Sequence, residues 1–210
     1  MKIAVIGAGN VGGTLGTGWA RAGHEVIYGV RNAADSKVQA LLDSARGKAR
    51  AASNSEAAAA VEIIVFATPW EVTEEAVKSC GSLAGKTVID VTNPLKPGLG
   101  GLTHGLTTSG VEHVAEWAKG AKLVKCFNTV GYNVMANPNF DGAKAVMFYC
   151  GDDAPAKLSA HQLAADLGFD PKDAGPLTQA RYLEPLAMLW ISMAVFHGYG
   201  NQFAFQFIQR

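Results

Sequence analysis

The feature that most constrains the fold is a glycine pattern that directly follows an apolar run at the start of the chain. Gly7, Gly9 and Gly12 form G-x-G-x-x-G between KIAVIG, which is typical of a buried strand, and a segment with helical spacing. The first glycine makes a tight turn, the second lets the backbone approach a pyrophosphate, and the third lets the helix pack closely. The pattern predicts a dinucleotide-binding unit, in which Asn10 and Val11 add backbone N–H donors at the helix start.

Further strand-like runs alternate with helical patterns along the chain. The runs are EVIYGV, a short segment near Ala49 to Ala52, EIIVFAT, TVIDVTN, KLVKCFN and AVMFYCG. EIIVFAT is so continuously apolar that it should lie in the centre of a sheet that is covered on both faces. This alternation predicts an α/β fold with a doubly wound, mostly parallel (Rossmann) sheet.

The pattern changes after Gly175. Pro185 stands where a helix could begin, and apolar residues then recur at helical spacing: Leu186, Leu189, Trp190, Met193 and Phe196. We therefore expect a dinucleotide-binding domain over residues 1–175 and a short helical C-terminal appendage over residues 176–210. The apolar stripe favours a role for this appendage in an interface with a second copy of the chain, or in packing on its own sheet.

Charge and composition exclude several classes of protein. The 210 residues contain 18 Lys plus Arg and 18 Asp plus Glu, which argues against a nucleic-acid binder or an anionic-membrane binder. The longest nearly apolar run, Pro185 to Phe196, is too short to span a bilayer. Because MKIAVIGAG leads directly into a strand, we expect no signal peptide and a cytoplasmic location. The three cysteines match no metal-binding spacing and are expected to be buried, reduced thiols.

An arginine stands where many dinucleotide-binding sequences have an acid. Arg31 ends the second strand, and no acidic residue lies between Glu25 and Asp35. A carboxylate would bind a free ribose 2′-hydroxyl, whereas a guanidinium attracts a 2′-phosphate. Asn32 can also donate to a phosphate, and Lys37 is a weaker candidate. The arrangement predicts NADP as the cofactor, with a solvated surface arginine as the alternative.

Three polar turns at the expected strand ends are candidates for the nicotinamide end of the site. Ligands of doubly wound sheets lie across the carboxyl ends of the strands. The turns are Thr68-Pro69-Trp70, Thr92-Asn93-Pro94 and Asn128-Thr129-Val130. Each is also an ordinary turn signal, so a purely structural role stays open.

The sequence assigns no catalytic residue. It contains no Tyr-x-x-x-Lys pair, and the histidines His104, His113, His161 and His197 are scattered. Carbonyl reduction needs a positioned proton donor. Hydride transfer between two rings needs mainly alignment and exclusion of water. The pattern favours a flavin-like acceptor, although a single histidine or a water molecule would be enough to supply a proton.

Several longer segments together resemble one known family. They are IGAGNVGGTLG, GVRN, FATPW, VIDVTNP, VKCFNTVGYNVMANP and GPLTQARYLEPLAMLW. Over nearly its whole length the chain resembles the coenzyme F-420-dependent NADP oxidoreductases, which are similar to the NADPH domain of the six-transmembrane metalloreductases. In the latter, hydride passes to a flavin. FNTVG and LEPLAMLW resemble the broad bacterial branch of the family, so F-420, FMN and FAD all stay open as acceptors.

The resemblance has implications for the site and for assembly. It implies that Gly9, Asn10, Val11, Arg31 and Asn32 hold NADP. It also implies that Thr68, Pro69 and the segment from Asn128 to Val130 lie by the nicotinamide. The acceptor would bind between the sheet and the C-terminal segment, in a homodimer.

Two other functions remain possible at this point. One is reduction of a small imine, keto acid or hydroxy acid, but relatives with that activity usually carry a large helical second domain. About 35 residues follow Gly175, which are too few for one. The other is a non-catalytic NADPH-binding redox sensor.

Overall fold

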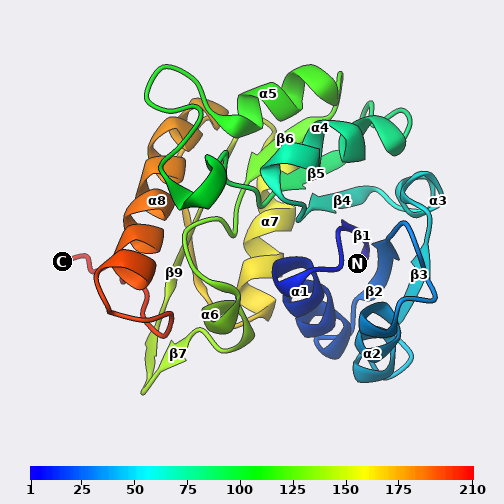
Figure 1. Cartoon of the computed structure of the whole chain (residues 1–210), viewed down its shortest axis with the longest axis horizontal. Coiled ribbons are helices and arrows are strands. Elements are labelled where there is room, and N and C mark those ends of the chain that lie inside the picture. The colour runs from blue at the N-terminus through cyan, green and yellow to red at the C-terminus, as the bar shows by residue number, and fades with distance from the viewer.

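The computed structural model describes residues 1–210 as alternating strands and helices (Figure 1). The strands are β1 Lys2–Ile6, β2 Glu25–Gly29, β3 Ala49–Ala52, β4 Ile63–Phe66, β5 Thr87–Asp90, β6 Lys122–Lys125, β7 Asn139–Phe140, β8 Ala143–Lys144, β9 Val146–Gly151 and β10 Asp170–Asp173. The helices are α1 Asn10–Arg21, α2 Ser36–Ser44, α3 Asn54–Ala59, α4 Trp70–Ser79, α5 Gly110–Trp117, α6 Tyr132–Ala136, α7 Ala154–Asp166 and α8 Ala180–Phe196.

Eight of the strands form one sheet in the order β10-β9-β6-β5-β4-β1-β2-β3. The six strands from β6 to β3 in this order are parallel to one another. β9 pairs with β6 in the antiparallel sense and with β10 in the parallel sense. The doubly wound, mostly parallel sheet that the sequence predicts is confirmed.

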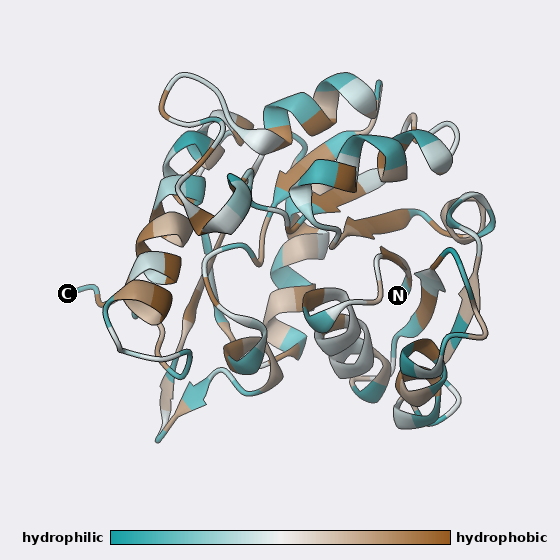
Figure 2. Cartoon of the chain, viewed as in Figure 1, coloured by the Kyte–Doolittle hydropathy of each residue, from teal (hydrophilic) through white to brown (hydrophobic).

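Helices cover both faces of this sheet. One hydrophobic cluster joins α1, α6 and α7 to one face, and a second joins α3, α4, α5 and the start of α8 to the other. Central β4 is buried at all four positions, as its unbroken apolar sequence predicts, and it is coloured as hydrophobic in Figure 2. Ala180 and Leu183 of α8 belong to the second cluster, so the C-terminal segment shares a core with the preceding residues.

The sequence pattern missed several elements. α6 and the β7–β8 hairpin are short, and β10 has the polar sequence DPKD. β10 pairs with β9 at the edge of the sheet, which is the position where a proline such as Pro171 is tolerated within a sheet. Its formation depends on that pairing and not on its own hydrophobic pattern.

The C-terminal helix begins earlier than expected. The sequence predicted a start at Pro185, but α8 begins at Ala180, and Pro185 lies inside it. The proline removes the N–H that would otherwise bond to the carbonyl of Arg181, and its ring crowds that carbonyl. Burial of Ala180 and Leu183 in the core favours this earlier start.

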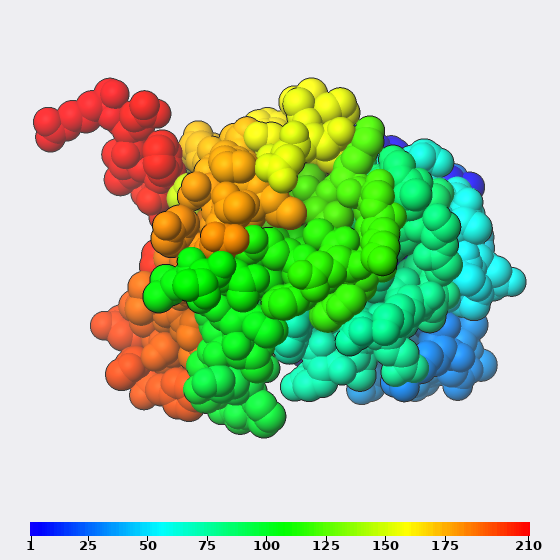
Figure 3. Space-filling model, turned by 90° about the horizontal axis from the view of Figure 1, so that it is seen from above, coloured from blue at the N-terminus to red at the C-terminus, as the bar shows by residue number.

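The last residues form no strand, although FAFQFIQR alternates like one. The Val146 N–H donates to the Phe205 carbonyl oxygen at 3.0 Å, and the Phe207 ring stands edge-on to Phe148. Beyond this contact the chain end projects from the body, and Ile208 is 82% exposed (Figure 3).

No helix has both the length and the apolar character needed to cross a membrane. No group of three or more His, Cys, Asp or Glu side chains is placed to hold a metal ion. The three cysteines are free and buried, as expected. Burial raises the pKa of the Cys80 and Cys150 thiols to about 12, so these thiols have little thiolate character at neutral pH.

Candidate dinucleotide-binding site

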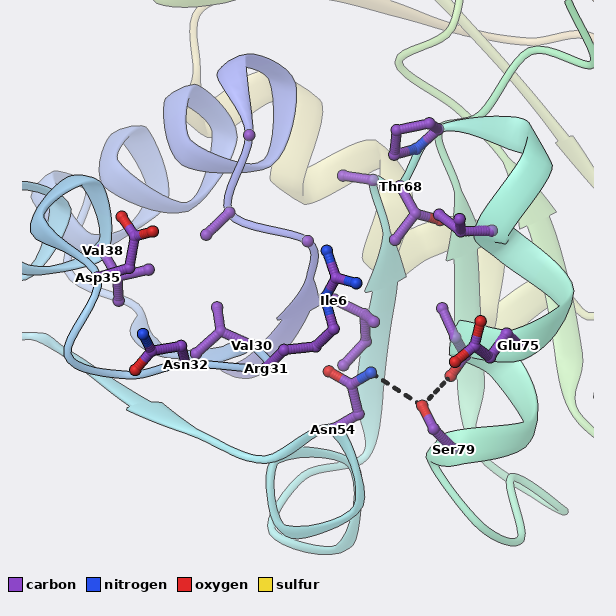
Figure 4. A pocket seen from close by; sticks show the side chains of 18 of the residues that line it. Ile6, Val30, Arg31, Asn32, Asp35, Val38, Asn54, Thr68, Glu75 and Ser79 are labelled. Carbon is purple, nitrogen blue, oxygen red and sulfur yellow. Dashed lines mark hydrogen bonds between the residues drawn. The ribbon is translucent and has the colours of Figure 1, made fainter.

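The strand order has a switch point at β1. The chain passes from β1 to β2 on one side and later returns to β4 on the other side. In doubly wound sheets, ligands bind outside the carboxyl ends of the strands at such a point. A cavity of about 470 Å³ opens there (Figure 4). Its lining residues are Ile6–Gly9, Gly29–Asn32, Asp35, Lys37, Val38, Asn54, Ala67–Pro69, Val72, Glu75, Ala76 and Ser79.

The three glycines of the motif have different surroundings. Gly7 has a φ of 102°, and a Cβ there would lie 2.8 Å from the Ala67 carbonyl oxygen. A Cβ at Gly12 would lie 1.9 Å from the Gly7 carbonyl oxygen, so the turn and the helix pack directly on each other. A Cβ at Gly9 would meet no atom within 4 Å. Gly7 and Gly12 are therefore required by the chain itself, whereas Gly9 borders the open cavity.

The start of α1 has free hydrogen-bond donors. Gly9 is the N-cap residue, no side chain caps the helix, and no acidic residue lies in its first turn. The first N–H groups of a helix have no partner within it and carry a partial positive charge. This end of the cavity is suited to an anionic group such as a pyrophosphate.

The end of β2 presents an unpaired positive charge. Arg31 is exposed, makes no hydrogen bond or ion pair, and extends into the middle of the cavity (Figure 4). Asn32 accepts the Ala34 N–H on its Oδ1 at 3.0 Å, which leaves its amide N–H groups free to donate. The nearby Asp35 carboxylate accepts the Lys37 N–H at 2.8 Å as the N-cap of α2. The Arg31 guanidinium and the free Asn32 amide are suited to a phosphate at this position.

One face of α4 forms the opposite wall, which the sequence analysis did not identify. Its residues follow the spacing i, i+3, i+4, i+7, namely Val72, Glu75, Ala76 and Ser79. The Asn54 Nδ2 donates to the Ser79 Oγ at 2.8 Å and closes the lower end of the cavity (Figure 4). The helical spacing of these residues is visible in the sequence. It does not by itself show that this face of α4 lies across the cavity from the end of β2.

The turn after β4 contributes two of its three candidate residues. Thr68 and Pro69 line the cavity, and the Thr68 hydroxyl lies 2.9 Å from that of Thr73. Trp70 does not line it. Its ring stands edge-on to His104 at 5.7 Å and is tilted against Trp117 at 5.5 Å.

The turns after β5 and β6 are bonded to each other and do not line the cavity. Asn93 Nδ2 donates to the Asn128 carbonyl at 2.9 Å, and Asn128 Nδ2 donates to Asn93 Oδ1 at 3.1 Å. Asn128, Thr129 and Val130 are almost fully buried in the chain. The structure thus brings the glycine loop, Arg31–Asn32 and Thr68–Pro69 into one cavity. The other candidates lie outside its lining, namely Asn10, Val11, Gly12, Trp70, Asn93, Asn128, Thr129 and Val130.

No histidine lines the cavity. His104 and His113 lie against each other with ring centroids 4.3 Å apart, and His104 packs next to Trp70. Burial, together with the neighbouring His113, lowers the pKa of His104 below its ordinary value, so this ring is neutral at pH 7. The structure supplies no evident proton donor within the cavity near Thr68.

Comparison with known proteins gives a match that covers the whole chain. A crystal structure from Arthrobacter sp. FB24, described as a candidate F420-dependent NADP reductase, has a TM-score of 0.89 and 33% identity, with 100% of both chains covered. The family model described as NADP oxidoreductase, coenzyme F420-dependent, matches residues 2–94. Both matched regions of the chain include the glycine loop and the end of β2.

A second relative shares only part of its length. Metalloreductase STEAP3 of Rattus norvegicus is 31% identical over 191 residues, which are 90% of this chain and 37% of the metalloreductase. The chain therefore spans little more than a third of that relative.

The fold also extends to more distant enzymes. A reductive aminase from Aspergillus terreus, solved in complex with NADPH and ethyl levulinate, has a TM-score of 0.69 and 24% identity. The match covers 94% of this chain and 62% of the aminase, and at this identity it shows a shared fold. The match over the full length, with one third of the residues identical, shows that this chain belongs to the coenzyme F420-dependent NADP oxidoreductase family and is an NADP-dependent oxidoreductase.

Proposed function

We propose that the chain binds NADPH across this cavity and transfers hydride from its nicotinamide to a flavin or deazaflavin ring. The observation that supports the proposal best is the free guanidinium of Arg31, which shares a cavity with the uncapped start of α1. Arg31 and Asn32 would hold the 2′-phosphate, and the N–H groups beside Gly9 would hold the pyrophosphate. The adenine would then lie against Val72 and Ala76 of α4.

The charges around the cavity support a flavin-type acceptor. Its ionisable side chains are Arg31, Asp35, Lys37 and Glu75, and all of them come from the segment between β2 and the start of α2 or from α4. None belongs to the turn after β4, where the nicotinamide half of the bound dinucleotide would begin. Carbonyl reduction needs a proton donor at the oxygen. Hydride transfer to a flavin or deazaflavin ring needs mainly alignment and exclusion of water, because the ring itself takes up the negative charge that arrives with the hydride. A flavin or deazaflavin such as F-420, FMN or FAD meets this requirement.

The acceptor is tested by NADPH oxidation with the purified chain. F-420, FMN, FAD and ferric chelates are offered in turn, followed by a cyclic imine and a small keto acid. Turnover with F-420 or a flavin supports the proposal. Turnover with only the imine or the keto acid would replace it by the alternative reductase activity. Tight NADPH binding without turnover of any acceptor would favour the redox sensor.

We expect Arg31→Ala to reduce the preference for NADPH over NADH. The guanidinium meets a dianionic phosphate in NADPH and has no partner in NADH. Such a charge-assisted contact contributes about 1.5–3 kcal/mol, so NADPH affinity should fall about 10- to 150-fold, with little change for NADH. Fluorescence titration with both cofactors measures this. Arg50→Ala, at an exposed arginine outside the cavity, is the matched control. Equal losses for NADPH and NADH in Arg31→Ala would show that Arg31 does not discriminate between them.

We further propose that α8 pairs two copies of the chain. Trp190, which belongs to the apolar stripe seen in the sequence, is buried in its own chain, where it stacks on Phe203 at 5.1 Å. Leu189, Val195 and Phe196 nevertheless stay more than half exposed. Three large apolar side chains exposed on one helix favour an interface, because monomers rarely expose large apolar patches.

The pairing predicts a dimer at micromolar concentration in light scattering. Leu189→Asp combined with Phe196→Asp should convert it to a monomer, because both charges would be buried at the interface. 2′,5′-ADP corresponds to the adenosine half of NADPH and serves as a probe of the cavity. Its affinity should stay unchanged, since neither residue lines the cavity. A monomeric wild-type chain would contradict the proposal.

A further inference from the structure

Three charged side chains without any exposed surface meet beside the candidate site: Asp90, Lys125 and Glu184. The Lys125 Nζ lies 2.8 Å from the Asp90 Oδ2 and 2.8 Å from the Glu184 Oε1, and it also donates to the Thr92 carbonyl. The three protons of the ammonium therefore have three acceptors. Neither the glycine loop nor Arg31 takes part in this network.

The network joins segments that lie far apart in the sequence. Asp90 and Lys125 are the last residues of β5 and β6 and are neighbours in the sheet register. Glu184 comes from α8, and its carboxylate also accepts the N–H groups of Gly110 at 2.8 Å and Val111 at 3.3 Å, in the first turn of α5. One buried cluster thus fixes the ends of two strands to two helices.

The residue next to Glu184 makes a second connection. The Leu183 carbonyl accepts the Asn128 Nδ2 at 3.1 Å, and Asn128 is in turn bonded to Asn93. The Thr92 N–H donates to the Asp90 Oδ1 at 3.1 Å. Two consecutive residues of α8 therefore fix both turns. Leu183 contacts the turn after β6, and Glu184 acts on the turn after β5 through Lys125.

Stability alone does not account for three buried charges at this place. Replacing buried ion pairs by apolar side chains is often neutral or stabilising, and apolar Ile89 and Val124 occupy the preceding strand positions. Hydrogen bonds to charged groups have, however, a definite direction and fix the position of the backbone that they join. The backbone fixed here lies on the side of β4 away from the adenosine half of the cavity, where a dinucleotide crossing the sheet would place its nicotinamide.

We propose that Glu184 and Lys125 are positioning residues. Through them, α8 sets the place of the turns at residues 91–94 and 128–130, and so the alignment of the nicotinamide with its acceptor. This inference rests on the proposed function for the site. It assigns to the C-terminal helix a role in the geometry of hydride transfer and none in holding the adenosine half.

Glu184→Gln tests the assignment. The glutamine keeps the size and one acceptor oxygen but loses the charge that faces Lys125. We expect kcat with the best acceptor to fall about 10- to 100-fold, because a small displacement of the reacting groups has an effect of this size. The affinity for 2′,5′-ADP, which fills only the adenosine half, should change less than about twofold, since its contacts are untouched. The KM for NADPH should change less than kcat.

Glu112→Gln is the matched control. It breaks another ion pair between α5 and α8, in which Arg181 lies 2.6 Å from the Glu112 carboxylate, and it touches neither turn. Its kcat should remain at the wild-type value. An equal loss of kcat in both variants would show that any loosening of α8 has this effect, and it would overturn the proposal. If Glu184→Gln does not fold, Asn128→Ser removes the amide contact with the Leu183 carbonyl, and an unchanged kcat in that variant would overturn it as well.

A binding measurement separates this inference from the proposed function. If the wild-type chain turns over no acceptor, the hydride-transfer proposal fails, but the ratio of NADPH affinity to 2′,5′-ADP affinity still reports on the nicotinamide half. Glu184→Gln should lower this ratio, and Glu112→Gln should not. A ratio that is the same in wild type and Glu184→Gln would contradict the positioning role, whatever the acceptor is.

Discussion

Gly9→Val is expected to abolish measurable NADPH binding while the chain stays folded. A Cβ at Gly9 meets no atom within 4 Å, so the new side chain starts in open space and should leave the fold intact. It would instead fill the space in front of the first N–H groups of α1, where we propose that the pyrophosphate binds. Fluorescence titration with NADPH measures the loss, and circular dichroism with thermal unfolding confirms the fold.

Gly12→Val provides the contrast. A Cβ at Gly12 would lie 1.9 Å from the Gly7 carbonyl oxygen, so this substitution should destabilise the chain itself. The two variants therefore separate a ligand effect from a folding effect within the same motif. Wild-type NADPH affinity in a folded Gly9→Val chain would exclude the glycine loop from the cofactor site.

The central part of the fold could be predicted because its signals are local. Buried parallel strands such as β1 and β4 are continuous apolar runs, and the glycine loop between β1 and α1 has a fixed spacing. β10 carries no such signal, since its residues form a strand only through pairing with β9. The start of α8 was misplaced for a related reason. The proline at 185 predicted a helix start, whereas burial of Leu183 determines it.

The candidate site could be predicted where a residue's role depends on backbone position. Arg31 was located from its place at the end of β2, and it lies in the cavity. Trp70 also follows a strand end, but the direction of its ring depends on packing against Trp117, from a different helix. Asp90 and Lys125 are visible as charges in apolar strands. Their partner Glu184 is distant in the sequence, and only the fold brings it to them.

Lys125→Met is expected to have the largest effect on stability. In the wild-type chain, burial disfavours the ammonium, but Asp90 and Glu184 outweigh it and raise the pKa of Lys125 above its ordinary value. Lys125 therefore stays charged at neutral pH, and its contribution to stability is lost only as the pH rises through that raised pKa. Removing it leaves two buried carboxylates without their cation. Such a change costs about 3–5 kcal/mol of unfolding free energy, which urea denaturation at pH 7 measures.

The pH dependence gives this prediction a second test. Without the ammonium, the folded chain favours the protonated form of the two carboxyl groups more than the unfolded chain does. Protons therefore stabilise the variant, and its deficit relative to wild type should shrink as the pH falls toward about 4 to 5, where free carboxyl groups titrate. Lys78→Met is the control, because Lys78 pairs with Glu74 at the surface and should contribute less than about 1 kcal/mol. If Lys125→Met costs no more than Lys78→Met, the buried charges do not depend on one another, and the case for Glu184 and Lys125 as a positioning pair loses its physical basis.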